Sequence, residues 1–132
     1  MDFLLFLIGT DEPLEGYWGR LDDAFAGCVI HVEKTNTNFI GRIVSLPQAM
    51  AEAGWQIGEP KWQEIRPDGS SRWLMRDLRK HFDTRTGRVV GIDLQEYNLS
   101  LAAGGRLRLY TGSLPMFPIQ SWKRIASPPS PN

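Results

Sequence analysis

Residues 27–44 read Gly-Cys-Val-Ile-His-Val-Glu-Lys-Thr-Asn-Thr-Asn-Phe-Ile-Gly-Arg-Ile-Val, and this stretch decides the class of fold. Apolar and polar side chains alternate with a period of two in 27–33 and again in 39–44, as is typical of β-strands with one buried face. The residues between the two runs, 35–38, are of the types that form turns. The stretch therefore predicts two antiparallel strands joined by a turn.

The same pattern recurs outward from this pair of strands in both directions. Further alternating runs cover 16–21, 61–66, 72–78, 88–95, 97–101, 106–111 and 119–125. Turn-forming residues separate several of them, at 67–70, 83–87 and 103–105. Eight or nine short strands at this spacing predict an all-β, mainly antiparallel barrel or sandwich.

One segment breaks the β pattern. Residues 45–54 carry an early proline, a run of good helix formers and a terminating glycine. This order predicts one short helix near 46–53.

Composition places the chain among ordinary globular domains. Its 132 residues suit one domain with its own core, and 42% hydrophobic with 23% charged residues excludes a disordered or collagen-like chain. Lys and Arg number 15, as do Asp and Glu, so no overall field draws the protein to nucleic acid or to an anionic membrane. Cys28 is the single cysteine, which excludes an internal disulfide.

The two ends of the chain differ from the part between them. Residues 1–13 contain a short apolar run at 3–8, and two interpretations stay open for it: a degenerate export signal, or a segment that packs on the domain and plugs the barrel. Residues 14–126 carry the strand pattern and form the predicted barrel domain. The proline-rich residues 127–132 lack apolar side chains and are expected to be a disordered tail.

Two short motifs lie at opposite ends of the strand pattern. Residues 15–18 read Glu-Gly-Tyr-Trp and residues 121–124 read Ser-Trp-Lys-Arg. The pair resembles the calycin superfamily, which includes lipocalins and fatty-acid-binding proteins, where a Gly-x-Trp on the first strand meets an Arg from the last. The resemblance implies a small barrel of eight or nine strands whose structural closure involves Gly16, Trp18 and Arg124. An indole face attracts a guanidinium, so Trp18 and Arg124 are expected to touch.

A closer resemblance is to an uncharacterised family of small bacterial exported proteins with a lipocalin-like domain. The similarity runs over roughly 14–125 and includes residues 14–18, 40–44, 57–60, Trp73, 82–83 with Gly87, 107–110 and 122–124. Val90 stands where the family tends to place an aromatic, and Leu109 stands where a glycine is usual. The resemblance implies a periplasmic or secreted barrel of unknown role, whereas the N-terminus as written would leave the protein in the cytoplasm.

Enzymatic and metal-binding patterns do not emerge from the sequence. Cys28, His31 and His81 are the available nitrogen and sulfur donors for a metal ion. Cys28 and His31 are three positions apart and point to opposite faces of a strand, so they cannot bind one ion together, and a structural zinc site needs four such ligands. Asp93 and Glu96 face opposite ways for the same reason. Hydrolase, P-loop and dinucleotide motifs are absent from the sequence. We therefore expect no enzyme, no metal and no cofactor.

Five tryptophans favour a ligand-binding interpretation. Trp18 and Trp122 are assigned to barrel closure, which leaves Trp55, Trp62 and Trp73 to line an apolar pocket. The interior of an eight-stranded barrel is just wide enough for side chains or one small ligand. The first hypothesis is therefore a module that binds an apolar or amphipathic small molecule.

Three arginines on predicted strands complete the candidate ligand site. Alternation would allow Arg42, Arg72 and Arg108 to point inward, as in fatty-acid binders that clamp a carboxylate with a buried arginine. Alternation fixes relative faces and does not say which face is inside. Arg42, Arg72 and Arg108 are therefore candidate ligand-binding residues, together with the three tryptophans.

Two other functions stay open. The barrel could be filled by its own side chains and serve as a structural or interaction protein, either as a monomer or as a weak homodimer. The basic, aromatic stretch 72–88 resembles a single-stranded nucleic-acid binder, but a net charge of zero argues against that function.

Overall fold

The computed structural model describes residues 13–112 and 119–126. Of the predicted barrel domain, 14–126, all but residues 113–118 are therefore described. The predicted N-terminal signal or plug, apart from Pro13, and the predicted C-terminal tail, 127–132, lie outside the described residues.

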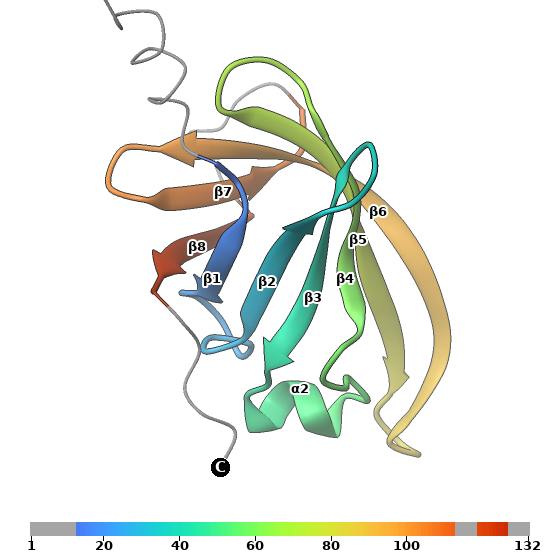
Figure 1. The fold of residues 1–132 in the computed structure, drawn as a ribbon. Coiled ribbons are helices and arrows are strands. Elements are labelled where there is room, and N and C mark those ends of the chain that lie inside the picture. Colours follow the sequence, from blue (N-terminus) through green and yellow to red (C-terminus); the bar gives the residue numbers. More distant parts are fainter. Residues whose placement is uncertain (1–12, 113–118, 127–132) are drawn as a thin grey trace, which may run out of the picture.

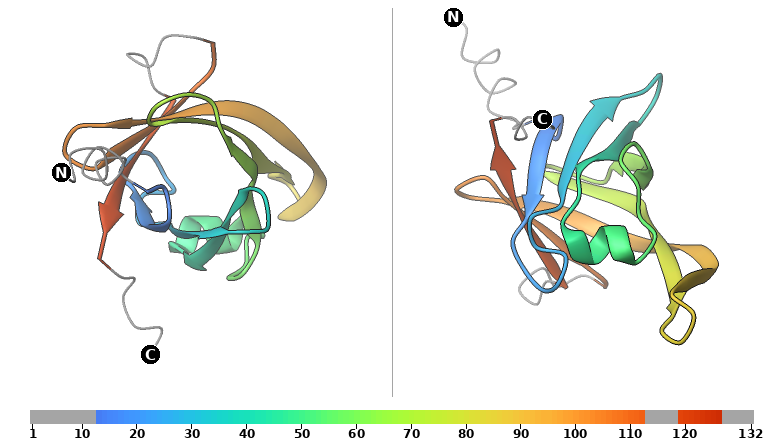
Figure 2. Two further views of the ribbon diagram at one scale, coloured as in Figure 1. Left: turned by 45° about the horizontal axis from the view of Figure 1, so that its top comes forward. Right: turned by 90° about the horizontal axis from the view of Figure 1, so that it is seen from below.

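Eight strands and one short helix make up the described chain (Figure 1). In chain order they are β1 (Gly16–Arg20), β2 (Val29–Lys34), β3 (Phe39–Ser45), α2 (Gln48–Glu52), β4 (Pro60–Pro67), β5 (Arg72–Asp83), β6 (Arg88–Ala102), β7 (Arg106–Tyr110) and β8 (Gln120–Ile125). The predicted helix is confirmed, and it lies beside one end of the barrel (Figures 1 and 2).

The strands form one closed antiparallel barrel. Each strand pairs with its neighbours in sequence, and β1 pairs with β8 to complete the wall. In that last pairing Trp18 lies opposite Arg124. The predicted all-β, mainly antiparallel barrel is thereby confirmed, and a two-sheet sandwich is excluded.

The strand count is eight because two predicted runs join. Residues 88–95 and 97–101 belong to the single long strand β6, which pairs with β5 from Arg88 to Ser100. Strand β5 likewise continues past the predicted end at residue 78 to Asp83. The two strands continue because they pair with each other as far as Asp83 and Arg88. Their side chains do not alternate regularly between apolar and polar over this whole length.

One end of the barrel is held by the contact between the first and last strands. The guanidinium carbon of Arg124 lies 4.3 Å from the centre of the Trp18 ring. Arg124 also donates hydrogen bonds to the carbonyls of Pro13 and Glu15, and the Trp18 indole donates to the Leu14 carbonyl at 2.9 Å. The charged end of one side chain thus ties the last strand to the first strand and to the backbone that precedes it.

Gly16 leaves room for this contact. Its φ of +129° is one that L side chains rarely adopt, and a Cβ there would lie 2.8 Å from Nη1 of Arg124. Gly19, three residues along β1, has no such constraint, because a Cβ there would meet its nearest neighbour at 3.7 Å. The glycine requirement is therefore specific to one position on the strand.

Replacing Gly16 by alanine is expected to lower the free energy of unfolding by about 1–3 kcal/mol, since the new methyl group adds backbone strain and displaces Arg124. Urea denaturation followed by tryptophan fluorescence measures the change. The matched control Gly19→Ala is expected to change stability by less than about 1 kcal/mol. Equal effects of the two substitutions would contradict this account of barrel closure.

An apolar core fills the part of the barrel interior between the contact of Trp18 with Arg124 and the residues Arg20 and Asp77. The side chains of Trp18, Trp62 and Trp122 are fully buried there, and the Trp62 and Trp122 rings meet edge to face at 4.8 Å. Gly41 on β3 makes room for this packing, because a Cβ there would lie 3.1 Å from the Cβ of Trp62. Large rings therefore pack closely against one another in this part of the interior.

Candidate ligand-binding site

A cavity of about 580 Å³ occupies the other end of the barrel. The β1–β2 connection, α2 and the tip of the β5–β6 hairpin gather at this end, the lower one in Figure 1. The lining residues are Arg20, Asp23, Ala24, Phe25, Ala53, Trp55, Lys61, Asp77, Arg79, Lys80, Phe82, Tyr97 and Gln120. The volume lies within the range of small-molecule sites, roughly 300–1,000 Å³.

Alternation along β1 and β5 brings polar side chains into the barrel. On β1, Arg20 shares the inward face with Trp18, two residues earlier. On β5, Asp77 follows the buried Trp73 and Met75 at the same spacing. Each strand therefore passes from apolar core at one end to charged cavity wall at the other.

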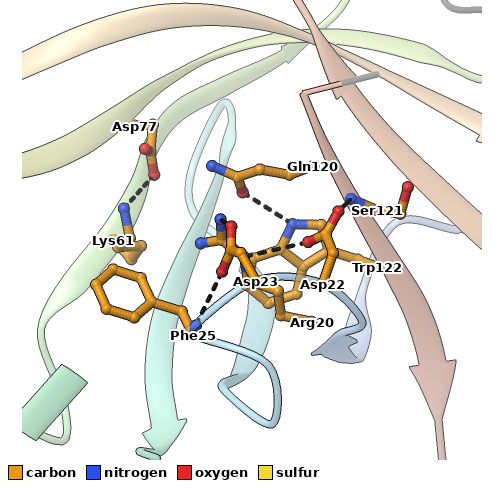
Figure 3. A network of polar contacts seen from close by, with 9 residues as sticks. All are labelled: Arg20, Asp22, Asp23, Phe25, Lys61, Asp77, Gln120, Ser121 and Trp122. Carbon is orange, nitrogen blue, oxygen red and sulfur yellow. Dashed lines mark hydrogen bonds and ion pairs between the residues drawn. The ribbon is translucent and has the colours of Figure 1, made fainter. Parts of the chain in front are cut away.

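The deepest charges in the cavity wall form an ion pair. Nζ of Lys61 lies 2.7 Å from Oδ1 of Asp77, and it also donates to the Leu78 carbonyl at 2.7 Å (Figure 3). The two side chains are only 5% and 3% exposed. Burial lowers the pKa of Lys61 and raises the pKa of Asp77, while the attraction between the two charges opposes both shifts. Each charge therefore depends on the other.

Arg20 is a second buried cation, and it forms ion pairs with two carboxylates. Its side chain is 7% exposed and forms an ion pair through Nη2 with Asp23, while its guanidinium lies over Phe25 and Trp122 (Figure 3). Its Nε has no hydrogen-bond partner among the described residues, and the nearest carboxylate oxygen, on Asp22, is 3.5 Å away. Arg20 is therefore held between the carboxylates of Asp22 and Asp23 in the cavity wall.

The loop after β1 holds these acids in place. The Phe25 amide donates to Oδ1 of Asp23 at 2.8 Å, and the Ser121 amide donates to Oδ2 of Asp22 at 3.2 Å (Figure 3). Asp23 has a φ of +59°, a left-handed conformation that aspartate tolerates better than most residues. The loop thereby positions both carboxylates beside Arg20.

Two lysines fix the aromatic wall of the cavity. The Nζ atoms of Lys61 and Lys80 lie 4.6 Å and 4.9 Å from the centre of the Trp55 ring. Lys80 also donates to the Gly54 carbonyl and pairs with Glu59, both at 2.8 Å. Trp55 is 5% exposed and is held by charge as well as by packing.

The cavity thus combines positive charge with ring surface. Its lining holds the four cations Arg20, Lys61, Arg79 and Lys80 and the two carboxylates of Asp23 and Asp77. Two further carboxylates beside the lining, Asp22 and Glu59, pair with Arg20 and Lys80. Phe25, Trp55, Phe82 and Tyr97 supply the apolar surface. Such a lining suits a molecule with one anionic group and an apolar body.

Of the three tryptophans predicted to bind a ligand, one lines the cavity. Trp55 is in its wall. Trp62 and Trp73 are buried in the hydrophobic core and are not among the lining residues.

None of the three predicted arginines lines the cavity. Arg42 and Arg72 are exposed, and Arg42 donates to the Gly58 carbonyl at 3.0 Å. Arg108 is half-buried on β7, between the buried Leu107 and Leu109. The structure does not bring these arginines together with Trp55 in one pocket.

The basic stretch 72–88 is divided among several environments. Arg79 and Lys80 line the cavity, and Lys80 is paired with Glu59. Arg76 reaches Glu64 at 3.7 Å on the surface, and His81 contacts Asp93 at 2.7 Å. The bases of this stretch therefore do not form one continuous row.

Cys28 and the histidines lie apart from each other. Cys28 is buried, and burial raises the pKa of its thiol to about 11. His31 stacks on Tyr17 with ring centres 4.2 Å apart. Within residues 13–112 and 119–126, no three His, Cys, Asp or Glu side chains gather as a metal site would require.

Comparisons with family models, with curated proteins and with solved structures find no match to this chain. In the described part of the chain, no helix is long and apolar enough to cross a membrane. The functional argument therefore rests on the cavity.

Proposed function

We propose that the chain is a non-enzymatic binding protein for a small amphipathic molecule that carries an anionic group. The observation that carries the proposal is a cavity of about 580 Å³ whose wall includes the guanidinium of Arg20 and the ring of Trp55. A carboxylate, sulfonate or phosphate group would accept from Arg20, and an apolar body would lie along the rings.

The charge of the wall sets the expected orientation of the ligand. Arg20, Lys61 and Asp77 lie on or beside the inner wall, whereas Phe82 is 38% exposed at the rim. An anionic group is therefore expected to enter first, with the apolar body toward Trp55 and Phe82. A cationic ligand would face the same four cations, three of which are paired with carboxylates, and is expected to bind less tightly than an anionic one.

We further propose that the barrel is of the calycin type. The contact between Trp18 and Arg124, together with the glycine at position 16, supports this assignment. Calycins include binders of fatty acids and other apolar molecules, so the assignment agrees with the proposed ligand class.

Competition against a fluorescent probe tests the function. The anionic dye 1-anilinonaphthalene-8-sulfonate is expected to bind the folded protein and to be displaced by dodecanoate. Dodecanoate is expected to bind roughly 10- to 100-fold more tightly than dodecanol, since one charge-assisted hydrogen bond contributes about 1.5–3 kcal/mol in a buried site. Dodecyltrimethylammonium, which has the opposite charge, should be the weakest of the three.

Two results would count against the proposal. If neither the dye nor any of the three chains binds, the barrel is filled and serves as a structural or interaction protein. If the cationic chain binds as tightly as the anionic one, the cations of the wall do not select the ligand.

A further inference from the structure

The β5–β6 hairpin extends beyond the barrel wall as a two-stranded ribbon. Strand β7 pairs with β6 only from Asn98 to Ala102, and β4 pairs with β5 only as far as Asp77. Residues 78–97 therefore have no third strand beside them among the described residues (Figures 1 and 2). The open edge of β6, over 88–97, presents unpaired backbone donors and acceptors that can template another strand.

Exposed apolar side chains follow this open edge. Val90, Ile92 and Leu94 are 67%, 63% and 40% exposed, and they stand at alternate positions of β6. Residues at alternate positions share one face of a strand, although the register with β5 shifts beside Val90. None of the three lines the cavity, so ligand binding does not explain their exposure.

Charge along β6 changes sign from one end of this segment to the other. Arg88 lies at the end nearest the hairpin tip, whereas Asp93 and Glu96 lie toward the barrel. Glu96 reaches Arg66 at 3.3 Å and still has a side chain that is 56% exposed. A strand with one basic end and one acidic end is complementary to an antiparallel copy of itself.

We propose that a second copy of this chain pairs with this edge, β6 against β6, antiparallel about a two-fold axis at Ile92. In this register Ile92 lies opposite Ile92 of the other copy. Val90 and Arg88 lie opposite Leu94 and Glu96 of the other copy. A register centred one residue further on would place the two Asp93 carboxylates opposite each other. Pairing about a two-fold axis uses the same edge on both copies and closes at two.

This dimer goes beyond the proposed ligand-binding function and does not depend on it. The residues that pair in the proposed dimer, 88–96, lie outside the cavity lining, while Arg79, Phe82 and Tyr97 of the same ribbon are part of it. A variant that loses the dimer can therefore be scored separately from one that loses the ligand.

Sedimentation equilibrium of the full chain over a wide concentration range tests the dimer. The wild-type protein is expected to reach twice its 15.0 kDa mass. Ile92→Lys is expected to stay monomeric over the same range, because two like charges would oppose each other at the axis. The matched control Ile57→Lys, at a residue 59% exposed in the loop before β4, should dimerise as the wild type does.

A charge-reversal cycle tests the register. Arg88→Glu is expected to weaken the dimer roughly tenfold, because it places like charges at both ends of the pairing. The double variant Arg88→Glu/Glu96→Arg restores opposite charges at both ends and should recover most of the loss.

Circular dichroism confirms that each variant is folded. A monomeric wild type at every concentration, a mass that grows past two copies, or a dimer that Ile92→Lys leaves intact would overturn the proposal. Failure of the double variant to recover would overturn the register.

Discussion

Replacing Lys61 by methionine is expected to lower the free energy of unfolding by about 3–5 kcal/mol, which is a large part of the stability of a domain of this size. Lys61 and Asp77 are almost wholly buried, and their Nζ and Oδ1 atoms are 2.7 Å apart. Without the ammonium group, the Asp77 carboxylate would be a buried charge with no cation bonded to it. Urea denaturation followed by tryptophan fluorescence measures the loss.

A second substitution separates the cost of a broken pair from the value of the pair itself. Replacing a buried ion pair by apolar residues of similar volume is often neutral or stabilising. The double variant Lys61→Met/Asp77→Leu is therefore expected to recover most of the stability lost in Lys61→Met. The exposed control Lys34→Met should change stability by no more than about 0.5 kcal/mol.

The ion pair account would be wrong if Lys61→Met cost less than about 1 kcal/mol. It would also be wrong if the double variant were as unstable as the single one. Full recovery in the double variant would indicate that the pair is retained for the polarity of the cavity and not for stability.

Replacing Arg20 by methionine is expected to weaken the binding of dodecanoate roughly 10- to 100-fold, since a charge-assisted hydrogen bond contributes about 1.5–3 kcal/mol. Arg20 lines the cavity, and its guanidinium lies over the rings of Phe25 and Trp122. Isothermal titration calorimetry measures the affinity.

Two controls accompany this variant. Arg20→Lys keeps the charge but loses the planar fork, so it is expected to bind with intermediate affinity. Arg72→Met removes an exposed arginine outside the cavity and should leave the affinity unchanged. Wild-type affinity in a folded Arg20→Met protein would contradict the role given to Arg20.

The barrel could be predicted from the sequence because its signals are local. Alternation within each run and turn residues between runs identify strands without knowledge of their partners. The expected contact of Trp18 with Arg124 followed from a resemblance between two motifs, and the structure places the two side chains together at 4.3 Å. Two runs were counted separately where β6 is continuous, since the polar Glu96 interrupts the alternation but not the pairing with Arg76.

The cavity was harder to predict, because alternation says which side chains share a face and not which face is inside. Arg42 lies between Gly41 and Ile43, which are buried, so Arg42 faces out. Arg108 has the same relation to its two leucine neighbours. The same rule applied to β1 and β5 would have placed Arg20 with Trp18 and Asp77 with Met75, so a signal for both existed in the sequence.

Lys61 could not have been found in this way. Lys61 and Trp62 are adjacent in sequence, and both are buried. In a regular strand, adjacent side chains point to opposite faces, so only one of the two would face the barrel interior. The pairing of β4 with β3 shifts register at Lys61, since Gly41 lies opposite Trp62 and Arg42 lies opposite Pro60. Burial of Lys61 depends on Asp77 and Trp55, which are distant in sequence.

Binding of an anionic amphipathic molecule between Arg20 and Trp55 can be followed through the five tryptophan indole signals in a ¹H–¹⁵N NMR spectrum. Titration with dodecanoate is expected to move the indole signal of Trp55, in the cavity wall, and to leave that of Trp18, at the closed end, in place. Saturating dodecanoate that leaves Trp55 unmoved, or that shifts Trp18 instead, would contradict the account.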